Sequence, residues 1–316
     1  MEKRILGNSD LEIYPVVFGG NVFGWTLNEK QSFEILDAFA EAGFNCIDTA
    51  DVYSRWKPGN SGGESETILG KWMKEKKNRQ DIILATKVGS DMGDGKKGLK
   101  KAYIMKAVEA SLKRLQTDYI DLYQTHFDDP SVPVQETLEA YDTLIKQGKV
   151  RWIGASNMSV ERLKESFAVA AAENLPQYQT LQPHYNLCER EGFENGYEPV
   201  CLGHGLGVIP YYSLAGGFLT GKYRGKSDLE KSPRGAGSEK YLNKKGFQIL
   251  AALDKTAAAY NTTPAAAALA WLIQRPSVTA PIASATSLSQ LQSLIKAPEL
   301  NLDANAIADL TAASAW

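Results

Sequence analysis

The segment Asn45-Cys46-Ile47-Asp48-Thr49-Ala50-Asp51-Val52-Tyr53 joins a short apolar strand to a polar loop that carries two carboxylates and a tyrosine. A helical pattern ends just before it, at Ala42-Gly43, so Cys46 and Ile47 are expected in a buried strand with Asp48 at its C-terminal end. A buried charge that lacks its partner costs roughly 3–5 kcal/mol. The segment therefore predicts a cation close to Asp48.

The same unit of strand, loop and helix recurs along the chain from residue 15 onward. Short apolar runs predict buried strands, and stretches with apolar side chains every three or four residues predict the helices between them. The predicted strands span residues 15–20, 45–48, 81–87, 119–126, 150–156, 179–182, 207–211 and 278–282. The predicted helices span residues 29–42, 65–77, 101–115, 133–148, 160–172, 197–204, 244–260, 264–274, 288–296 and 305–313.

Eight strands that alternate with helices, with no linker between them, favour an α/β fold in which a parallel sheet closes on itself. We therefore predict a single-domain (β/α)8 TIM barrel over residues 1–316, preceded by a β-hairpin at 1–14 and ended by a C-terminal helix. A doubly wound open sheet is the alternative. The turn after the first strand, residues 18–24, lacks the G-x-G-x-x-G spacing, so a Rossmann dinucleotide site has no support.

Composition narrows the classes of function. The formal net charge is −2 and both signs are mixed along the chain, which gives no basic face for nucleic acid or for an anionic membrane. Neither a secretory leader nor a membrane-spanning stretch is apparent, so a cytoplasmic location is expected. Three widely spaced cysteines are typical of reduced thiols, and we expect no metal site. The oligomeric state stays open.

Three polar residues stand at or just after predicted strand ends, where a barrel holds its functional groups: Asp48, Lys87 and His126. Lysine is almost never buried unpaired, so Asp48 is the natural counterion of Lys87. Tyr53 lies in the loop beyond Asp48. Each residue alone has an ordinary structural role, as a cap, an edge charge, a core histidine or a packed aromatic. Four such groups at one barrel mouth favour a functional site.

The chain resembles the aldo-keto reductase superfamily over essentially its whole length. The segments that carry the resemblance are residues 45–53, Gly63-Glu64-Ser65-Glu66 with Leu69-Gly70, Ala85-Thr86-Lys87 and residues 118–126. Unlike the potassium-channel β subunits of that superfamily, this chain keeps a histidine at position 126, and its longer loop 54–62 is similar to the bacterial and plant branch. The resemblance implies a catalytic tetrad, formed by Asp48, Tyr53, Lys87 and His126.

The implied activity is the reversible NAD(P)H-dependent reduction of aldehydes and ketones to alcohols. Tyr53 would donate the proton, and because a tyrosine with a pKa near ~10 is a poor acid, Lys87 would favour its phenolate. Asp48 would hold Lys87 in place and keep it charged. His126 would donate a hydrogen bond to the carbonyl oxygen.

The resemblance also implies a nicotinamide cofactor, with NADP as the first choice and NAD as the alternative. Ser156, Asn157 and Gln182 would hold the carboxamide. The first two also have an ordinary role as caps of the following helix, and the two roles can coexist. Tyr211 would stack on the nicotinamide ring. The implied pyrophosphate-binding residues are Ser213, Leu214, Gly216, Lys222 and Arg224. A cofactor-side loop is expected at residues 215–240. Its part 225–240 either folds over the cofactor or is disordered.

At the adenosine end, relatives that prefer NADP place an arginine or lysine where this chain has hydroxyl and amide side chains, namely Ser284, Thr286 and Gln290. Hydrogen bonds and the next helix N-terminus could still bind a phosphate there, but losing a charge-assisted pair weakens a preference for NADP by ~1.5–3 kcal/mol.

The substrate pocket is expected to be walled by aromatic side chains, which are Trp25, Trp56 and Phe127. They favour small-molecule carbonyl substrates with apolar or aromatic surface. Two rival functions remain. Lys87 could form a Schiff base in a lyase, although a nearby carboxylate would keep its amine protonated. Alternatively, the chain could be a non-enzymatic partner subunit that senses NADPH.

Overall fold

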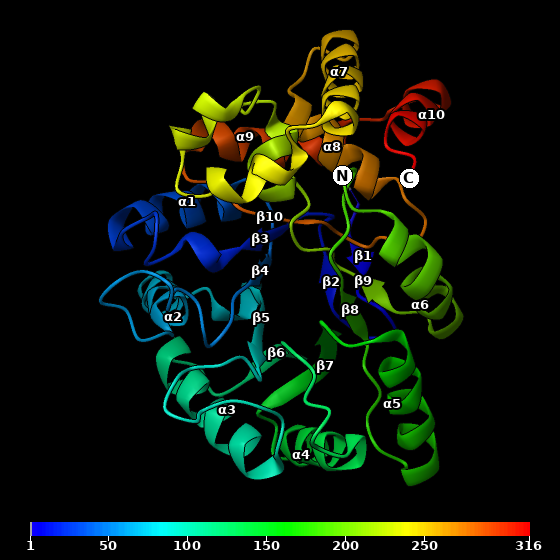
Figure 1. The fold of residues 1–316 in the computed structure, drawn as a ribbon. Coiled ribbons are helices and arrows are strands. Elements are labelled where there is room, and N and C mark those ends of the chain that lie inside the picture. Colours follow the sequence, from blue (N-terminus) through cyan, green and yellow to red (C-terminus); the bar gives the residue numbers. More distant parts are fainter. Residues whose placement is uncertain (1) are drawn as a thin grey trace.

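The computed structural model describes residues 2–316 and contains eight parallel strands in the order β10-β3-β4-β5-β6-β7-β8-β9. Helices surround these strands (Figure 1), which confirms the predicted TIM barrel. The strands are β3 (Val17–Gly19), β4 (Cys46–Asp48), β5 (Ile83–Val88), β6 (Ile120–Thr125), β7 (Val150–Ser156), β8 (Thr180–Gln182), β9 (Gly207–Val208) and β10 (Ile282–Ala283).

The barrel closes between the segments that contain β9 and β10. The backbone N–H groups of Thr279 and Ala280 donate to the Val208 carbonyl at 2.9 and 3.3 Å, and that of Ile282 donates to Pro210 at 3.0 Å. Both strands are shorter than the predicted 207–211 and 278–282. Pro210 and Pro281 have no N–H to give to a ladder, so the pairing is sparse at this seam.

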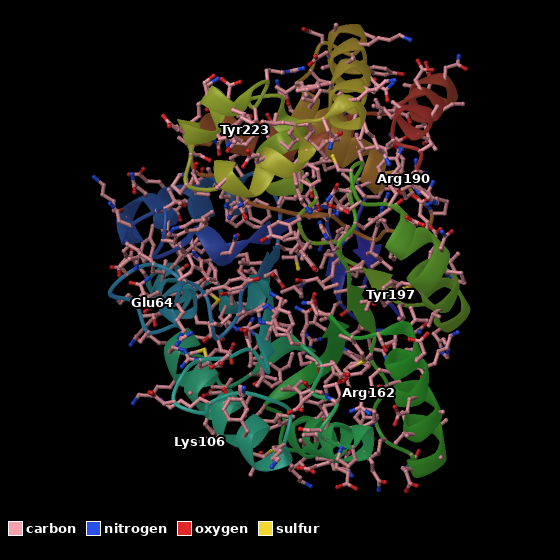
Figure 2. All side chains as sticks on the ribbon, in the orientation of Figure 1. Glu64, Lys106, Arg162, Arg190, Tyr197 and Tyr223 are labelled. Carbon is pink, nitrogen blue, oxygen red and sulfur yellow. The ribbon has the colours of Figure 1, made fainter. Side chains whose placement is uncertain are left out.

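Helices form the outer layer, and their bounds lie close to the predicted ones. They are α1 (Glu29–Glu41), α2 (Glu64–Lys76), α3 (Lys101–Leu115), α4 (Val134–Lys146), α5 (Val160–Glu173), α6 (Glu198–His204), α7 (Lys244–Ala259), α8 (Pro264–Ile273), α9 (Leu288–Lys296) and α10 (Ala304–Ala313). Apolar faces pack inward, while charged side chains such as Lys106 on α3 point outward (Figure 2). Within residues 2–316, no helix has both the length and the hydropathy that crossing a bilayer requires.

The predicted hairpin consists of β1 (Arg4–Ile5) paired antiparallel with β2 (Glu12–Ile13). Its Leu6, Leu11 and Ile13 are buried in a cluster with the first residues of β3 and β4, Val17 and Cys46. These contacts place the hairpin against the N-terminal end of the barrel, beside β8 and β9 in Figure 1. The floor of the barrel is therefore closed, and the opposite end carries the polar residues.

The segment after β9, predicted as a long loop, forms a series of short 3-10 turns at Ala215–Thr220, Lys226–Lys231 and Gly235–Tyr241. Gly235 fits against the backbone of Leu229, where an added Cβ would lie 1.8 Å from the carbonyl oxygen. This close approach joins two of the turns, so the segment has a defined path along the C-terminal side of the barrel.

Candidate functional site

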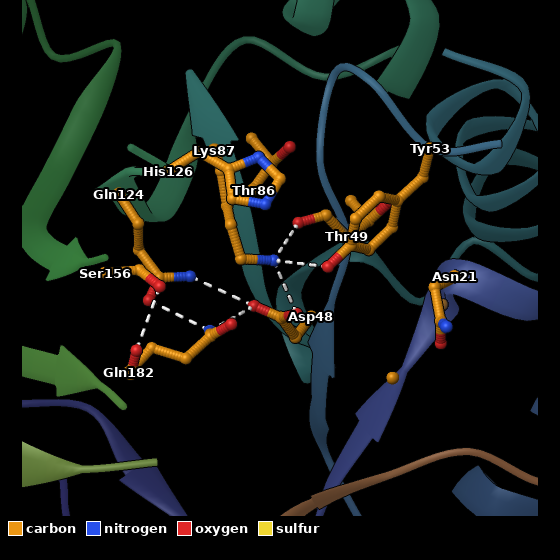
Figure 3. A network of polar contacts seen from close by, with 12 residues as sticks. Asn21, Asp48, Thr49, Tyr53, Thr86, Lys87, Gln124, His126, Ser156 and Gln182 are labelled. Atoms are coloured by element: carbon orange, nitrogen blue, oxygen red, sulfur yellow. Dashed lines mark hydrogen bonds and ion pairs between the residues drawn. The ribbon is translucent and has the colours of Figure 1, made fainter. Parts of the chain in front are cut away.

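A buried ion pair lies at the centre of the barrel mouth (Figure 3). Asp48 ends β4 and Lys87 lies in β5, with the Lys87 Nζ 2.6 Å from the Asp48 Oδ2. The same ammonium donates to the Thr49 carbonyl at 2.7 Å and to the Tyr53 hydroxyl at 3.1 Å. Lys87 is 0% exposed and Asp48 1%, so each charge is held by protein groups rather than by water. Lys87 thus supplies the cation expected beside Asp48.

Burial and charge act in opposite directions on this pair of titratable groups. Burial lowers the pKa of Lys87. The carboxylate of Asp48 and the hydroxyl of Tyr53 together raise it by more, so the pKa of Lys87 lies above its ordinary value. Burial raises the pKa of Tyr53 more than the Lys87 charge lowers it. Desolvation therefore outweighs the effect of the Lys87 charge, which alone would lower the pKa of Tyr53. The side chain of Tyr53 is a neutral phenol beside a charged ammonium.

His126 follows directly after β6, and its backbone N–H donates to the Val88 carbonyl at 2.8 Å. Its ring centroid lies 5.9 Å from that of Tyr53 in an edge-to-face arrangement. Burial, followed by the Lys87 charge, lowers the pKa of His126 well below its ordinary value, so the ring is neutral at physiological pH. The Nδ1 atom is buried and has no hydrogen-bond partner among the described residues.

Gln124 is a polar residue of the site that the sequence reasoning missed. Its Nε2 donates to the Asp48 Oδ1 at 3.0 Å, and the Nε2 of Gln182 donates to the same oxygen at 2.9 Å. Alternation along β6 places Gln124 on the face that also carries His126. The available signal was a polar side chain two residues before His126, on the same face of the strand.

Ser156 and Asn157 lie at the end of β7 and bond to the strands on either side. The Ser156 hydroxyl donates to the Gln182 carbonyl at 2.9 Å, and the Asn157 Nδ2 donates to the His126 carbonyl at 2.9 Å. The alternative role for these two residues as helix caps is wrong, because Ser159 caps α5 by accepting from the Arg162 N–H.

Tyr211 follows β9 and donates its hydroxyl proton to the Asn157 Oδ1 at 3.0 Å. Its ring stacks on that of His184, with centroids 5.3 Å apart and an interplanar angle of 12°. His184 was not singled out from the sequence. His184 lies two residues after the end of β8 and lines the same cleft. Its position just after a predicted strand could have identified it from the sequence.

A cleft of about 1340 Å³ runs from these residues to the N-terminus of α9. Typical single-ligand pockets measure roughly 300–1,000 Å³, so this cleft has room for a cofactor together with a substrate. The predicted site residues that line it are Trp25, Asp48, Tyr53, Trp56, His126, Phe127, Ser156, Asn157, Gln182, Tyr211, Ser213, Leu214, Gly216, Lys222, Ser284, Thr286 and Gln290. Lys87 lies behind Tyr53 and does not line it.

Arg224 is the one predicted cofactor residue that the structure does not bring to this site. Its guanidinium bonds to the Asp254 carboxylate at 2.7 Å and to the Gly221 carbonyl at 2.8 Å. Its position gives no support to a role in binding phosphate. Arg234, which the sequence reasoning missed, lines the cleft instead and lies 5.3 Å from the Trp25 ring. The Arg234 Nη2 is buried without a hydrogen-bond partner among residues 2–316.

Near these cations the backbone takes an unusual form. Gly216 and Gly217 have φ angles of 67° and 103°, a left-handed conformation that glycine adopts without strain. The Gly217 N–H donates to the Leu214 carbonyl at 2.9 Å and closes a tight turn there. The Lys222 Nζ would lie 3.2 Å from a Cβ added at Gly217, so its ammonium faces the same glycine.

At the other end of the cleft, the polar lining from the loop after β10 and from α9 consists of hydroxyl and amide side chains. The Ser284 hydroxyl lies 2.7 Å from the Gly19 carbonyl and 2.8 Å from the Asn21 Oδ1. Thr286 donates from its backbone N–H and its hydroxyl to the Gln290 Oε1, at 2.9 and 3.1 Å. Ser284 therefore bonds to the end of β3 and the turn after it, whereas Thr286 and Gln290 form a separate pair at the α9 N-terminus.

The three predicted wall residues gather beside Tyr53. Trp56 packs edge-to-face on both Tyr53 and Trp25, with centroid distances of 5.6 Å in each case. Phe127 stacks on His126 at 5.0 Å. Trp56 and Phe127 are each 46% exposed, and Tyr212, another cleft residue, is 55% exposed. The entrance to the polar centre therefore has an aromatic rim.

The chain is similar to known proteins over nearly its whole length. Residues 15–315 match the model of the aldo/keto reductase family. The chain is 36% identical to the "uncharacterized oxidoreductase YrpG" of Bacillus subtilis, over 96% of this chain and 93% of that protein. It is 37% identical to the B. subtilis "aldo-keto reductase YhdN", over 87% and 81% of the two chains. It is also 32% identical to a "probable voltage-gated potassium channel subunit beta" of Arabidopsis thaliana, over 95% and 92%.

The family model covers nearly the whole barrel, and the relatives align with it from end to end. Members of this family carry out carbonyl reduction with nicotinamide cofactors. This chain therefore belongs to the aldo/keto reductase family of oxidoreductases.

Proposed function

We propose that this protein reduces aldehydes and ketones to alcohols with NADPH, and that Tyr53 is the proton donor. The observation that carries the proposal is the fully buried Lys87 ammonium, which contacts both the Asp48 carboxylate and the Tyr53 hydroxyl. An ammonium in that position stabilises the phenolate that forms when Tyr53 gives up its proton. Asp48 keeps the ammonium charged and holds it in place.

A bound nicotinamide cofactor supplies hydride to the carbonyl carbon. As charge develops on the carbonyl oxygen, the Tyr53 O–H bond breaks and its proton passes to that oxygen, which completes the alcohol. The resulting phenolate is stabilised by Lys87 and regains a proton from solvent. The neutral His126 ring has one N–H, which orients the carbonyl by a hydrogen bond and lowers the cost of charge on its oxygen.

The residues of the cleft fit a dinucleotide. Ser156, Asn157 and Gln182 lie together in the cleft, which supports the proposal that they hold the carboxamide. The orphaned Nη2 of Arg234 and the ammonium of Lys222 provide charged donors for phosphate. NADP is the first choice from the family resemblance. NAD stays the alternative, because the lining from α9 offers hydrogen bonds but no cation for a 2′-phosphate. A kcat/KM ratio that favours NADH would overturn the choice of NADP.

The aromatic rim supports carbonyl substrates with apolar or aromatic surface. Trp25, Trp56 and Phe127 lie around Tyr53 and His126, and offer rings on which a flat substrate can pack. We therefore propose small aromatic and apolar aldehydes and ketones as the substrate class.

The test is NADPH consumption with 4-nitrobenzaldehyde, compared between the wild type and Tyr53→Phe. Loss of a general acid costs typically 10²–10⁴-fold in rate, so we expect Tyr53→Phe to be at least about 10²-fold slower in kcat. NADPH binding, measured by quenching of protein fluorescence, should stay within about twofold because the phenyl ring is retained. A Tyr53→Phe enzyme with near wild-type kcat would sink the assignment.

A non-catalytic NADPH-binding partner subunit is a second candidate, favoured by the relatives from A. thaliana and rice that carry the name of a channel β subunit. Tight NADPH binding without turnover of any aldehyde would support it. A Schiff-base lyase is disfavoured because Asp48, 2.6 Å from the Lys87 Nζ, keeps the amine protonated. A Lys87 adduct trapped with borohydride would argue for the lyase.

A further inference from the structure

Tyr212 is a bulky residue in a backbone conformation that bulky residues rarely adopt. Its φ angle is 52°, in the left-handed region that glycine occupies without strain. The fully buried Asn186 holds the backbone there, because its Nδ2 donates to the Tyr212 carbonyl at 3.0 Å, and the Ala215 N–H donates to the same oxygen at 2.7 Å. A strained residue that its surroundings fix in this way points to a role for its side chain.

The side chain of Tyr212 lines the cleft and is more than half exposed. Among residues 2–316, the hydrogen bonds of Tyr212 use its backbone carbonyl, which leaves its hydroxyl for a ligand. Burial, more than any charge, raises the pKa of Tyr53, and the Tyr212 hydroxyl adds to this rise. The two hydroxyl groups are therefore near enough to influence each other, and Tyr212 faces the part of the cleft that holds the proposed proton donor.

The ring contacts divide the aromatic residues of the cleft into two groups. Tyr212 packs on Tyr211 and His184, with centroid distances of 5.3 and 5.5 Å. The other group is built around Trp56, which packs on Tyr53 at 5.6 Å. Both groups line the cleft, so a ligand between them meets aromatic rings on two sides.

The orientation of the Tyr212 ring separates its role from that of Tyr211. The planes of these two rings are inclined by 62°. A flat nicotinamide that stacks on Tyr211, as proposed above, lies at the same angle to Tyr212 and cannot stack on it face to face. The face of Tyr212 is thus left for a second ring, and the substrate is the ligand expected beside Tyr53.

We propose that Tyr212 is a specificity-determining residue that selects flat aromatic aldehydes with a hydrogen-bond acceptor on the ring. Its own ring forms the wall of the substrate pocket on the side away from Trp56, and its hydroxyl donates to the acceptor. The inference rests on the proposed function and narrows its substrate class, since the aromatic rim alone also admits apolar aldehydes that carry no such acceptor.

The first test compares kcat/KM for benzaldehyde with that for cyclohexanecarbaldehyde, whose saturated ring has a similar size but is not flat. A contact between two aromatic rings corresponds to roughly a three- to tenfold effect, so Tyr212→Gly should lower the preference for benzaldehyde by that factor. Tyr212→Phe retains the ring and should retain the preference. An unchanged preference in Tyr212→Gly would refute the proposal.

The second test concerns the hydroxyl and compares benzaldehyde with pyridine-4-carbaldehyde, which has the same shape and a ring nitrogen that accepts a hydrogen bond. One hydrogen bond corresponds to roughly a three- to tenfold effect, so Tyr212→Phe should lower the preference for the pyridine compound by that factor. The different reactivities of the two aldehydes cancel when the ratios of two enzymes are compared. Equal ratios in the wild type and Tyr212→Phe, or a loss that appears in the Kd of NADPH instead, would overturn the proposal.

Two controls separate the loss of this wall from general damage. Phe247→Ala removes an aromatic side chain that is 41% exposed on α7 and does not line the cleft, so both ratios should match the wild type. Tyr212→Gly should have a Tm no lower than that of the wild type, because glycine adopts this backbone without strain. Loss of the preferences in Phe247→Ala as well would mean a general effect and would contradict the proposal.

Wild-type turnover of 4-nitrobenzaldehyde tests the proposed function separately. If the wild type reduces no aldehyde, the proposed function fails and the role of Tyr212 fails with it. If the wild type reduces aldehydes and the ratios are the same in all variants, only the role of Tyr212 is overturned.

Discussion

Asp51 lies two residues before Tyr53, on the loop that presents the proposed proton donor. It is 2% exposed, and neither carboxyl oxygen has a hydrogen-bond partner among residues 2–316. Burial, together with the nearby Glu66, raises the pKa of Asp51 to about 8. At neutral pH this carboxyl is therefore mostly protonated in the folded protein and ionised in the unfolded chain.

We predict that Asp51→Asn stabilises the protein near neutral pH. Between the ordinary pKa of 3.8 and the folded value of about 8, the folded state binds more protons than the unfolded state. The free energy of unfolding therefore falls as pH rises through this window, by up to about 1.4 kcal/mol per pH unit for a single group. Asparagine removes this loss of stability. The free energies of unfolding measured with urea at pH 5 and pH 8 should therefore differ less for the variant than for the wild type. Equal pH slopes for both proteins would contradict the raised pKa.

At the scale of the elements, the turns between Ala215 and Tyr241 decide which cations reach the cleft. Arg234 packs over Trp25 while Arg224 pairs with Asp254 on α7. Both arginines stand in the same Gly- and Lys-rich stretch, and nothing in the spacing of the residues separates them. The path of the chain through three short turns makes the distinction.

We predict that Arg234→Met weakens NADPH binding by about tenfold or more, because a hydrogen bond to a charged group contributes about 1.5–3 kcal/mol. The dependence of Kd on salt should also become shallower, since one cation is lost. Arg224→Met is the control, and its Kd should stay within about twofold. Both Kd values are measured by fluorescence titration. Equal losses of NADPH affinity in the two variants would show that Arg234 acts through general electrostatics and not through a direct contact with the cofactor.

At the scale of the whole molecule, one end of the barrel contributes to stability and the other carries the candidate site. Leu6, Leu11 and Ile13 of the hairpin close the N-terminal end, and the polar site occupies the C-terminal end. Substitutions in the hairpin should therefore change stability without changing the chemistry. This division is the general property of barrels that allows function to vary on a constant core.

We predict that Leu11→Ala, at a residue that is 1% exposed, lowers the free energy of unfolding by about 2–5 kcal/mol. Kinetic constants measured well below the unfolding transition should match those of the wild type. Ile5→Ala on the same hairpin is the control, because Ile5 is 59% exposed and its loss should cost no more than about 0.5 kcal/mol. A large change in kcat with Leu11→Ala would mean that the floor and the site are coupled.

The sequence by itself determined the alternation of strands and helices, because periodicity is a local property that burial imposes on each element. It also singled out Asp48, Lys87 and His126, because polar groups at strand ends are conspicuous against apolar strands. Tyr53 was added from its place in the loop beyond Asp48 and from the family resemblance. The weak seam at Pro210 and Pro281 was not predicted, since a shortened ladder depends on partners far apart in the chain.

Only the tertiary structure decided how the side chains meet. Gln124 reaches Asp48 because register across three strands places it there, and the amide of Gln182 is oriented by two groups from different strands. The geometry of the turns places Arg234 at the cleft and Arg224 beside Asp254. Contacts between residues distant in sequence depend on strand register and loop path, and the spacing of residue types carries no direct record of either.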